Sequence, residues 1–219
     1  PVIDSEQKLV GRITIDDAVD SIIEDAERDY QLASGISEDV ESSDSVITLT
    51  RARLPWLLIG LIGGIGGAYV IGWFDIKENA EMALFIPLIA AMGGNVGVQS
   101  AAIVVQGLAS SHMNTNNLLR RLSKELGVGI LNGLICGLII LGVTLLLNFG
   151  TSLSITVSLA LLCVIIFAAL FGTFVPLMLH RYKIDPALAT GPFITTVNDI
   201  IGLMIYFAVG SLISSLILS

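Results

Sequence analysis

The chain has 219 residues, of which 54% are hydrophobic and only 14% are charged, well below the roughly 25% of an ordinary soluble domain. This composition excludes a soluble globular protein and predicts an integral membrane protein. The net charge of -8 is uneven: residues 1–45 carry 13 acidic and three basic side chains, whereas the rest of the chain is slightly basic. No basic face is available for nucleic acid, so we expect no nucleic-acid partner.

Residues 1–30 predict a short α/β segment. Residues 1–4 and 9–15 are strand-like on either side of a polar turn, and a helix is predicted from residue 16 to about residue 30. The pattern Pro-Val-x-Asp, Leu-Val-Gly and Thr-x-Asp-Asp resembles the C-terminal end of a CBS domain, a soluble module that senses nucleotides or ions. One hairpin and one helix are marginal as an independent domain. We therefore expect this segment to be the end of a cytoplasmic CBS-like domain of a longer protein.

Residues 31–53 predict an acidic linker and a short helix at the membrane surface. The first part, to residue 44, is polar without a hydrophobic period, as in a solvated linker. Residues 45–54 can form a juxtamembrane helix, which would place Arg51 and Arg53 among the lipid headgroups.

Five apolar segments follow, and each meets the roughly 20 residues that a helix needs to cross about 30 Å of hydrocarbon. They predict an all-α transmembrane domain over residues 54–219, with spans at residues 54–74, 82–109, 126–149, 153–179 and 187–218.

Basic residues predict the orientation of these spans, because cytoplasmic loops carry an excess of Lys and Arg. The basic residues before the first span and in the loops after the second and fourth spans are Arg51, Arg53, Arg120, Arg121, Lys124, Arg181 and Lys183. We therefore expect a cytoplasmic N-terminus and a C-terminus on the opposite side.

The fifth segment contains Asp199, the only carboxylate well inside an apolar segment. An ionised side chain at the bilayer centre costs roughly 2.5–3.5 kcal/mol on insertion scales, so it is rarely retained without a function. On a helix, one face holds the residues at i, i+4, i+7 and i+11, which are Thr195, Asp199, Gly202 and Tyr206. We interpret this face as a metal-ion site beside a wet cavity. The alternative is that Asp199 pairs structurally with a polar group on a neighbouring helix.

The second segment contains another polar cluster. Asn95 and Gln99 are four residues apart and lie on one helical face, and Gly93, Gly94 and Gly97 leave the backbone around them uncovered. Two polar clusters on different spans indicate one shared site. The pore-lining candidates are Asn95, Gln99, Thr195, Asn198 and Gly202.

Three motifs in the membrane domain are similar to those of the MgtE family of magnesium channels and transporters. They are Gly93-Gly94-Asn95-x-Gly97-x-Gln99-Ser100, Asp185-Pro186-Ala187 and Asn198-Asp199-x-x-Gly202-Leu203-x-Ile205-Tyr206. The resemblance covers nearly the whole chain, from the CBS-like end to the fifth span. It implies a multi-pass protein of the plasma or inner membrane of a prokaryotic cell.

The resemblance also implies a function. The family's fold is a homodimer whose central pore, lined by the second and fifth spans, carries Mg²⁺ into the cytoplasm, and the family's pore acid corresponds to Asp199. Mg²⁺ is also expected to act as a regulator: it binds the cytoplasmic region and closes the pore, with the juxtamembrane helix as a plug. Gly191 and Pro192, at the start of the fifth span, are the gating candidates, although some members carry Asn in place of Gly191.

The chemistry of Mg²⁺ agrees with this interpretation. The ion prefers octahedral oxygen ligands and loses water reluctantly, so proteins hold it through one or two carboxylates with several waters retained. Two Asp199 side chains across a two-fold axis meet that requirement. Two other interpretations remain: a secondary transporter of a small solute or another divalent cation that couples through Asp199, and a non-transporting membrane protein. An enzyme is not expected, because two His and two Cys supply neither a nucleophile–base pair nor a metal-ligand set.

Overall fold

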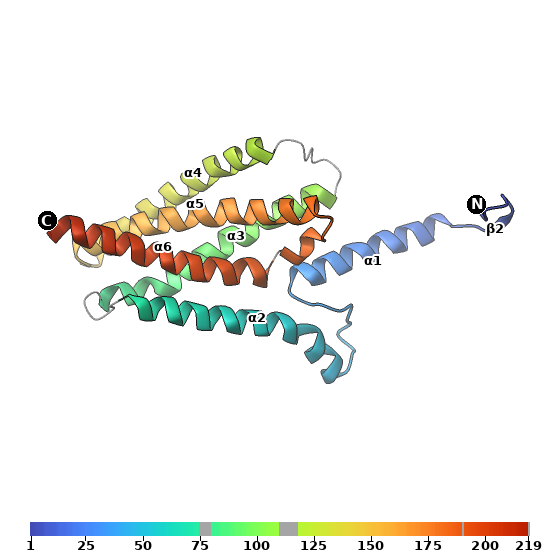
Figure 1. The fold of residues 1–219 in the computed structure, drawn as a ribbon, viewed down its shortest axis with the longest axis horizontal. Coiled ribbons are helices and arrows are strands. Elements are labelled where there is room, and N and C mark those ends of the chain that lie inside the picture. The colour runs from blue at the N-terminus through green and yellow to red at the C-terminus, as the bar shows by residue number, and fades with distance from the viewer. Residues whose placement is uncertain (75–79, 110–117, 190, 219) are drawn as a thin grey trace.

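The computed structural model describes residues 1–74, 80–109, 118–189 and 191–218 (Figure 1). Two short strands are followed by helices throughout. The elements are β1 (Val2–Ile3), β2 (Leu9–Gly11), α1 (Ile15–Ala33), α2 (Val46–Trp73), the 3₁₀ helix η1 (Ala80–Phe85), α3 (Ile86–Ala109), α4 (Leu118–Leu146), α5 (Thr151–Arg181), the 3₁₀ helix η2 (Pro186–Ala189) and α6 (Pro192–Leu218).

Five helical segments of the described chain are long and apolar enough to cross a membrane: α2, η1 together with α3, α4, α5 and α6. The predicted all-α membrane architecture with five spans is therefore confirmed. One difference concerns the predicted juxtamembrane helix, because residues 46–54 are continuous with the first span in α2. Pro55 lies inside this helix, and α2 bends toward its N-terminal end (Figure 1), as expected for a proline that removes one backbone hydrogen bond.

The N-terminal segment projects away from the bundle (Figure 1). Strands β1 and β2 pair in an antiparallel hairpin, and a capping box begins α1: the backbone N–H of Thr14 donates to Asp17 Oδ2 at 2.7 Å and the N–H of Asp17 donates to Thr14 Oγ1 at 3.2 Å. The hydrogen bonds from Thr14 lower the pKa of Asp17. Val19, Ile22 and Ile23 remain exposed along α1, so this segment has no core of its own within the described chain.

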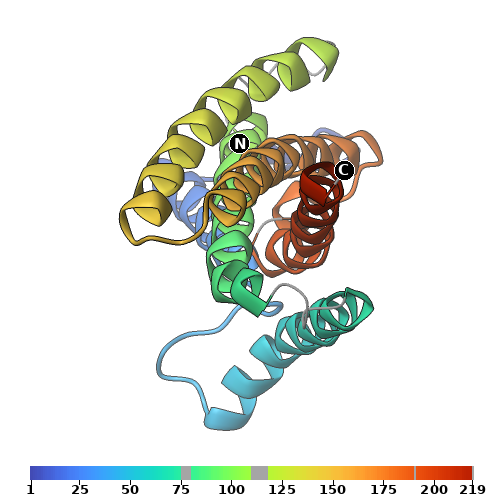
Figure 2. The ribbon, with the colours of Figure 1, turned by 90° about the vertical axis from the view of Figure 1, so that its left-hand side faces the viewer.

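Helix α5 is the centre of the bundle and packs against α3, α4 and α6. Small residues bring α4 close to it: the hydroxyl of Ser158 on α5 donates to the carbonyl of Gly137 at 2.7 Å. Helix α2 lies at the edge of the bundle (Figure 2) and packs on α6, with little direct contact to α3 among the described residues. Helix α6 is thus surrounded on three sides, by α2, α3 and α5.

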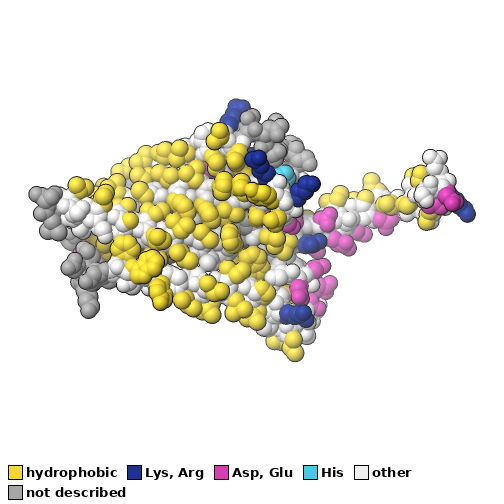
Figure 3. All heavy atoms as spheres, in the orientation of Figure 1, with side chains coloured by type: hydrophobic (Ala, Val, Ile, Leu, Met, Phe, Trp, Pro, Cys, Tyr) yellow, Lys and Arg dark blue, Asp and Glu magenta, His cyan; other side chains and the backbone are white. Residues whose placement is uncertain are grey.

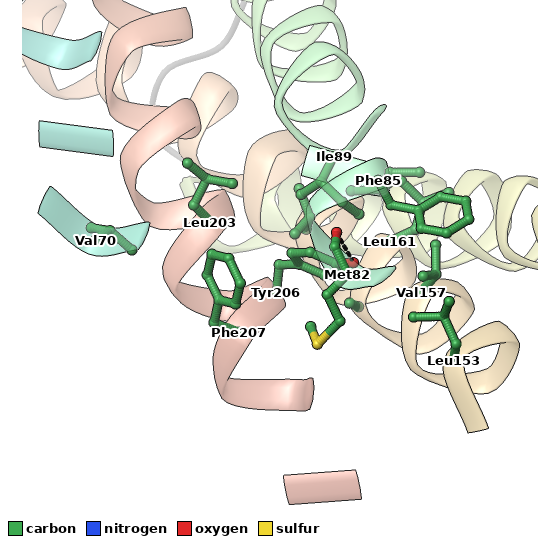
Figure 4. Packing of buried hydrophobic residues seen from close by; sticks show 13 residues of the cluster. Val70, Met82, Phe85, Ile89, Leu153, Val157, Leu161, Leu203, Tyr206 and Phe207 are labelled. Carbon is green, nitrogen blue, oxygen red and sulfur yellow. Dashed lines mark hydrogen bonds between the residues drawn. The ribbon is translucent and has the colours of Figure 1, made fainter. Parts of the chain in front are cut away.

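A hydrophobic cluster joins α3, α5, α6 and η1 in the half of the bundle where α6 ends (Figure 4). Tyr206 is fully buried at its centre, and its hydroxyl donates to the carbonyl of Met82 at 2.8 Å. Phe207 stacks on Phe74 with a centroid separation of 5.0 Å. This packing fixes the height of α6 relative to η1, because a buried phenol must keep its hydrogen-bond partner.

Candidate metal-ion site

On the surface of α6, Asp199 lies between the residues that contact α2 and the residues that contact α3. On one side, Thr196 and Ile200 face α2, where a Cβ on Gly66 would come within 2.9 Å of Ile200 Cδ1. On the other side, Thr195 faces α3, where a Cβ on Gly94 would lie 3.3 Å from Thr195 Cγ2. Asp199 itself is half-buried. Asp199 therefore lies on the strip of α6 between its contacts with α2 and its contacts with α3.

The Asp199 carboxylate has neither a hydrogen bond nor an ion pair among the residues that the structure describes. The ion pair found in the described chain joins Arg51 and Glu38, in a different part of the molecule. A structural salt bridge or amide partner within the described chain is therefore not what retains this residue. A half-buried anion without a partner attracts cations strongly, because the surrounding medium screens it less than water does.

Asn198, the neighbour of Asp199, is buried inside the subunit. Its side chain is 1% exposed, and Nδ2 donates to the carbonyl of Gly93 on α3 at 3.2 Å. Gly97 lies one turn further along α3, and a Cβ there would collide with the Asn198 amide. The Asn198 Oδ1 atom has no hydrogen-bond partner within the described part of the chain. We infer that Asn198 sets the height of α6 against α3 and thereby the position of Asp199.

The other four pore-lining candidates fall into two groups, one facing the interior of the subunit and one exposed. Thr195 and Gly202 face the interior of the subunit: Thr195 Oγ1 donates to the carbonyl of Pro192 at 3.0 Å, and Gly202 is buried against Val164 of α5. Asn95 and Gln99 are exposed on the free face of α3. The structure thus brings Thr195, Asn198 and Gly202 together near Asp199 and leaves the two α3 amides on the surface of the single chain.

Gly191 and Pro192, at the start of α6, contact the end of α1. Gly191 has φ +59°, and a Cβ there would collide with the carbonyl oxygen of Ala33. Gly35, with φ +80°, stands against the Pro192 ring, to which a Cβ would come within 2.6 Å. Both positions favour glycine, because the left-handed region is costly for other residues. Sequence reasoning did not predict this contact.

The same contact is electrostatically unfavourable. Partial burial, followed by the charges of Asp185 and Asp25, raises the pKa of Asp29 near the end of α1. Asp185 lies in the turn before η2, where its Oδ1 accepts from the N–H of Ala187 at 2.9 Å. The end of α1 is therefore held against the α5–α6 connection despite repulsion between carboxylates.

The family model for MgtE, described as a divalent cation transporter, matches residues 86–209, from the start of α3 to most of α6. The chain belongs to the MgtE family. Members of this family are transporters and not enzymes, in agreement with the sequence analysis. The matched region contains both predicted polar clusters and the α3–α6 interface that positions Asp199.

Curated MgtE relatives are similar over nearly the whole chain. Each is named a magnesium transporter: one from Bacillus subtilis is 34% identical over 96% of this chain and 47% of the relative. One from Enterococcus faecalis is 34% identical over 97% and 47%, and one from Thermus thermophilus is 31% identical over 97% and 48%. The chain spans about half the length of these relatives.

The inferred role of Asn198 predicts an asymmetry between two asparagines. Asn198→Ala leaves the Gly93 carbonyl without its donor and opens a cavity, so the free energy of unfolding should fall by about 1–3 kcal/mol. Asn95→Ala removes an exposed amide and should change it by less than about 0.5 kcal/mol. Thermal unfolding of both variants in the same detergent checks this, and equal midpoints would contradict the inferred role.

Proposed function

We propose that this chain forms the membrane pore of a magnesium channel. The observation that carries the proposal is the half-buried carboxylate of Asp199, which has no hydrogen-bond or ion-pair partner among the described residues, on a helix whose neighbouring residues Thr195 and Asn198 pack on the glycines of α3. The name magnesium transporter, which the relatives carry, supports Mg²⁺ as the substrate. A single carboxylate fits an ion that keeps most of its water, because Mg²⁺ dehydrates reluctantly.

Influx into the cytoplasm follows from the predicted orientation in a plasma or inner membrane. With the N-terminus and the basic loops inside, the inside-negative potential favours cation entry by about 2.3 kcal/mol per charge for each 100 mV. Conduction then needs no coupling reaction. A coupled secondary transporter remains the rival, and it differs in requiring proton or sodium movement with each ion.

The pore is proposed to lie on the two-fold axis of a homodimer. In the described spans, Asp199 is the one carboxylate near the middle of the membrane, and a second copy doubles the negative charge. The free face of α3 supports this arrangement, because Asn95 and Gln99 are exposed there and amides facing hydrocarbon are costly. A second copy on the same face would give these amides a polar surrounding and an isologous interface.

The dimer predicts like-to-like cross-linking. In a background where Cys136 and Cys163 are replaced by alanine, Asn95→Cys should form an intermolecular disulfide in native membranes, because equivalent residues meet near a two-fold axis. Leu138→Cys, on the exposed face of α4, should remain monomeric in the same assay. Non-reducing electrophoresis after mild oxidation reads out both, and equal cross-linking of the two variants would contradict the proposed interface.

If Asp199 is the pore site, its substitution should lower Mg²⁺ flux without lowering thermal stability. Asp199→Asn keeps the volume and removes the charge, so Mg²⁺ uptake into proteoliposomes should fall at least about tenfold while thermal stability is kept or raised, because a neutral amide is cheaper in a membrane. Asp199→Glu should keep part of the flux with altered ion selectivity.

Glu81→Gln is the matched control, since it removes one carboxylate from the exposed surface of η1; its flux should stay near that of the unaltered protein. Near-normal flux per folded Asp199→Asn molecule would rule out the pore site. A current that requires a proton gradient would instead favour the coupled transporter.

We further propose that Mg²⁺ regulates the pore through the contact between α1 and α6. The end of α1 lies against Gly191 and Pro192, so its position affects the first turn of the pore helix. Asp29 and Asp185 repel one another across this contact. Because the pKa of Asp29 is raised in the docked state, docking should strengthen as the pH falls through this raised value. Divalent cations at neutral pH should act in the same direction by screening the two carboxylates.

Gly191→Ala tests this gate. A Cβ at this position collides with Ala33, and the positive φ disfavours alanine, so α1 should undock. We expect faster amide hydrogen exchange at the end of α1 and weaker inhibition of flux by high cytoplasmic Mg²⁺. Gly150→Ala, where a Cβ meets nothing within 4 Å, is the control. Unchanged exchange and unchanged inhibition in Gly191→Ala would rule out this contact as the gate.

A further inference from the structure

A cavity lies outside the proposed pore, where α4 begins and α5 ends. Its volume is about 980 Å³. Its apolar walls include Leu177, Met178 and Ile184, and its polar rim includes His180, Arg181 and Lys183. The cavity therefore has an apolar part and a cationic part side by side.

A second, apolar groove is lined by the same two helices. It measures about 450 Å³ and is lined by Leu122, Leu126, Phe171 and Phe174, among others. Phe174 and Met178 are one helical turn apart on α5, as are Leu118 and Leu122 on α4, so successive turns of the same two helices line the groove and the cavity. Figure 1 shows α4 and α5 separating toward this end.

The cations around the cavity lack acidic partners. Arg120, Arg121 and Lys124 lie in the first two turns of α4, the helix that supplies Leu118 to the cavity wall. Neither they nor the rim residues Arg181 and Lys183 have an ion pair among the described residues. Figure 3 shows basic side chains gathered here at the edge of the apolar band. Asp185 also lines the cavity, but its Oδ1 accepts from the N–H of Ala187 and its charge acts on Asp29 of α1.

We propose that this cavity and groove bind one anionic phospholipid. The phosphate would lie among the guanidinium and ammonium groups of Arg181 and Lys183, and an acyl chain would follow the groove between α4 and α5. Basic pockets at the headgroup level of membrane helices suit anionic lipids for this reason. A free phosphate would use the rim alone, and an acidic protein segment would leave the apolar groove open to hydrocarbon.

The proposed lipid site lies on the connection that leads into the pore helix α6, so a bound lipid would affect transport. Lys183 and Ile184 belong to the connection between α5 and α6, a few residues before Gly191 and Pro192. A bound headgroup would therefore restrain the segment that leads into the pore helix. The site itself does not depend on the transported ion, so its test is independent of the proposed pore.

Native mass spectrometry of the full chain, released from detergent with equimolar phosphatidylglycerol and phosphatidylcholine, tests the site. We expect at least about tenfold preferential retention of one phosphatidylglycerol per chain. Arg181→Gln with Lys183→Gln should lower this retention about tenfold and leave phosphatidylcholine unchanged. Arg51→Gln with Arg53→Gln, which removes two cations at the start of α2, is the matched control and should retain the lipid.

Groove variants distinguish a lipid site from general surface charge. Ser123→Trp fills the groove without changing the charge and should also lower phosphatidylglycerol retention. Phe174→Ala removes an exposed wall of the groove and provides a second variant if the first does not fold. Retention unchanged in the folded groove variants would overturn the proposal. Equal loss in the Arg51 and Arg53 control, or displacement of the lipid by millimolar inorganic phosphate, would overturn it as well.

Discussion

A carboxylate in the middle of a membrane helix has to be kept from the lipid, and the arrangement of this bundle around α6 follows from that constraint. Hydrocarbon offers Asp199 no compensation for lost hydration. Helices α2, α3 and α5 pack around α6, and Asp199 lies half-buried on the strip of α6 between α2 and α3. Among the described residues α2 and α3 have little direct contact with each other, so neither of them covers the strip of α6 that carries Asp199 completely.

Two polar contacts hold α6 at a fixed height in the bundle. Asn198 donates to Gly93 on α3, and Tyr206 donates to Met82 on η1. They are eight residues apart, or about 12 Å along the helix, and they lie on either side of the level of Gly202. Apolar packing alone permits a helix to slide, whereas a buried donor must keep its acceptor. The two contacts therefore fix both the height and the rotation of Asp199.

The spans and the shared face of α6 were predictable from sequence, because bilayer thickness dictates the length of a span and the helical period dictates which residues share a face. The contact of α1 with α6 was not, because it is made by backbone: Gly35 and Gly191 adopt positive φ beside Pro192 and the carbonyl of Ala33, and no side-chain pattern marks it. The inward direction of Asn198 was also missed, since adjacent residues diverge by about 100° and only the packing of α3 decides which one is buried.

On the side of the bundle where α6 begins, the acidic residues and the basic residues lie mostly on different segments. The acidic linker lies near the start of α2, where Arg51 Nε is 3.6 Å from Glu38 Oε1 and the N–H of Ser37 donates to the carbonyl of Ala52 at 2.9 Å. The ion pair is solvent-exposed and contributes at most about 1 kcal/mol, so the backbone hydrogen bond from Ser37 is the more protected of the two contacts between the linker and α2. The cations of α4 and α5 receive no such acidic partner among the described residues. The two proposed roles, regulation by cations through the acidic segment and binding of an anionic lipid by the basic helices, thus concern separate charges at the same end of the bundle.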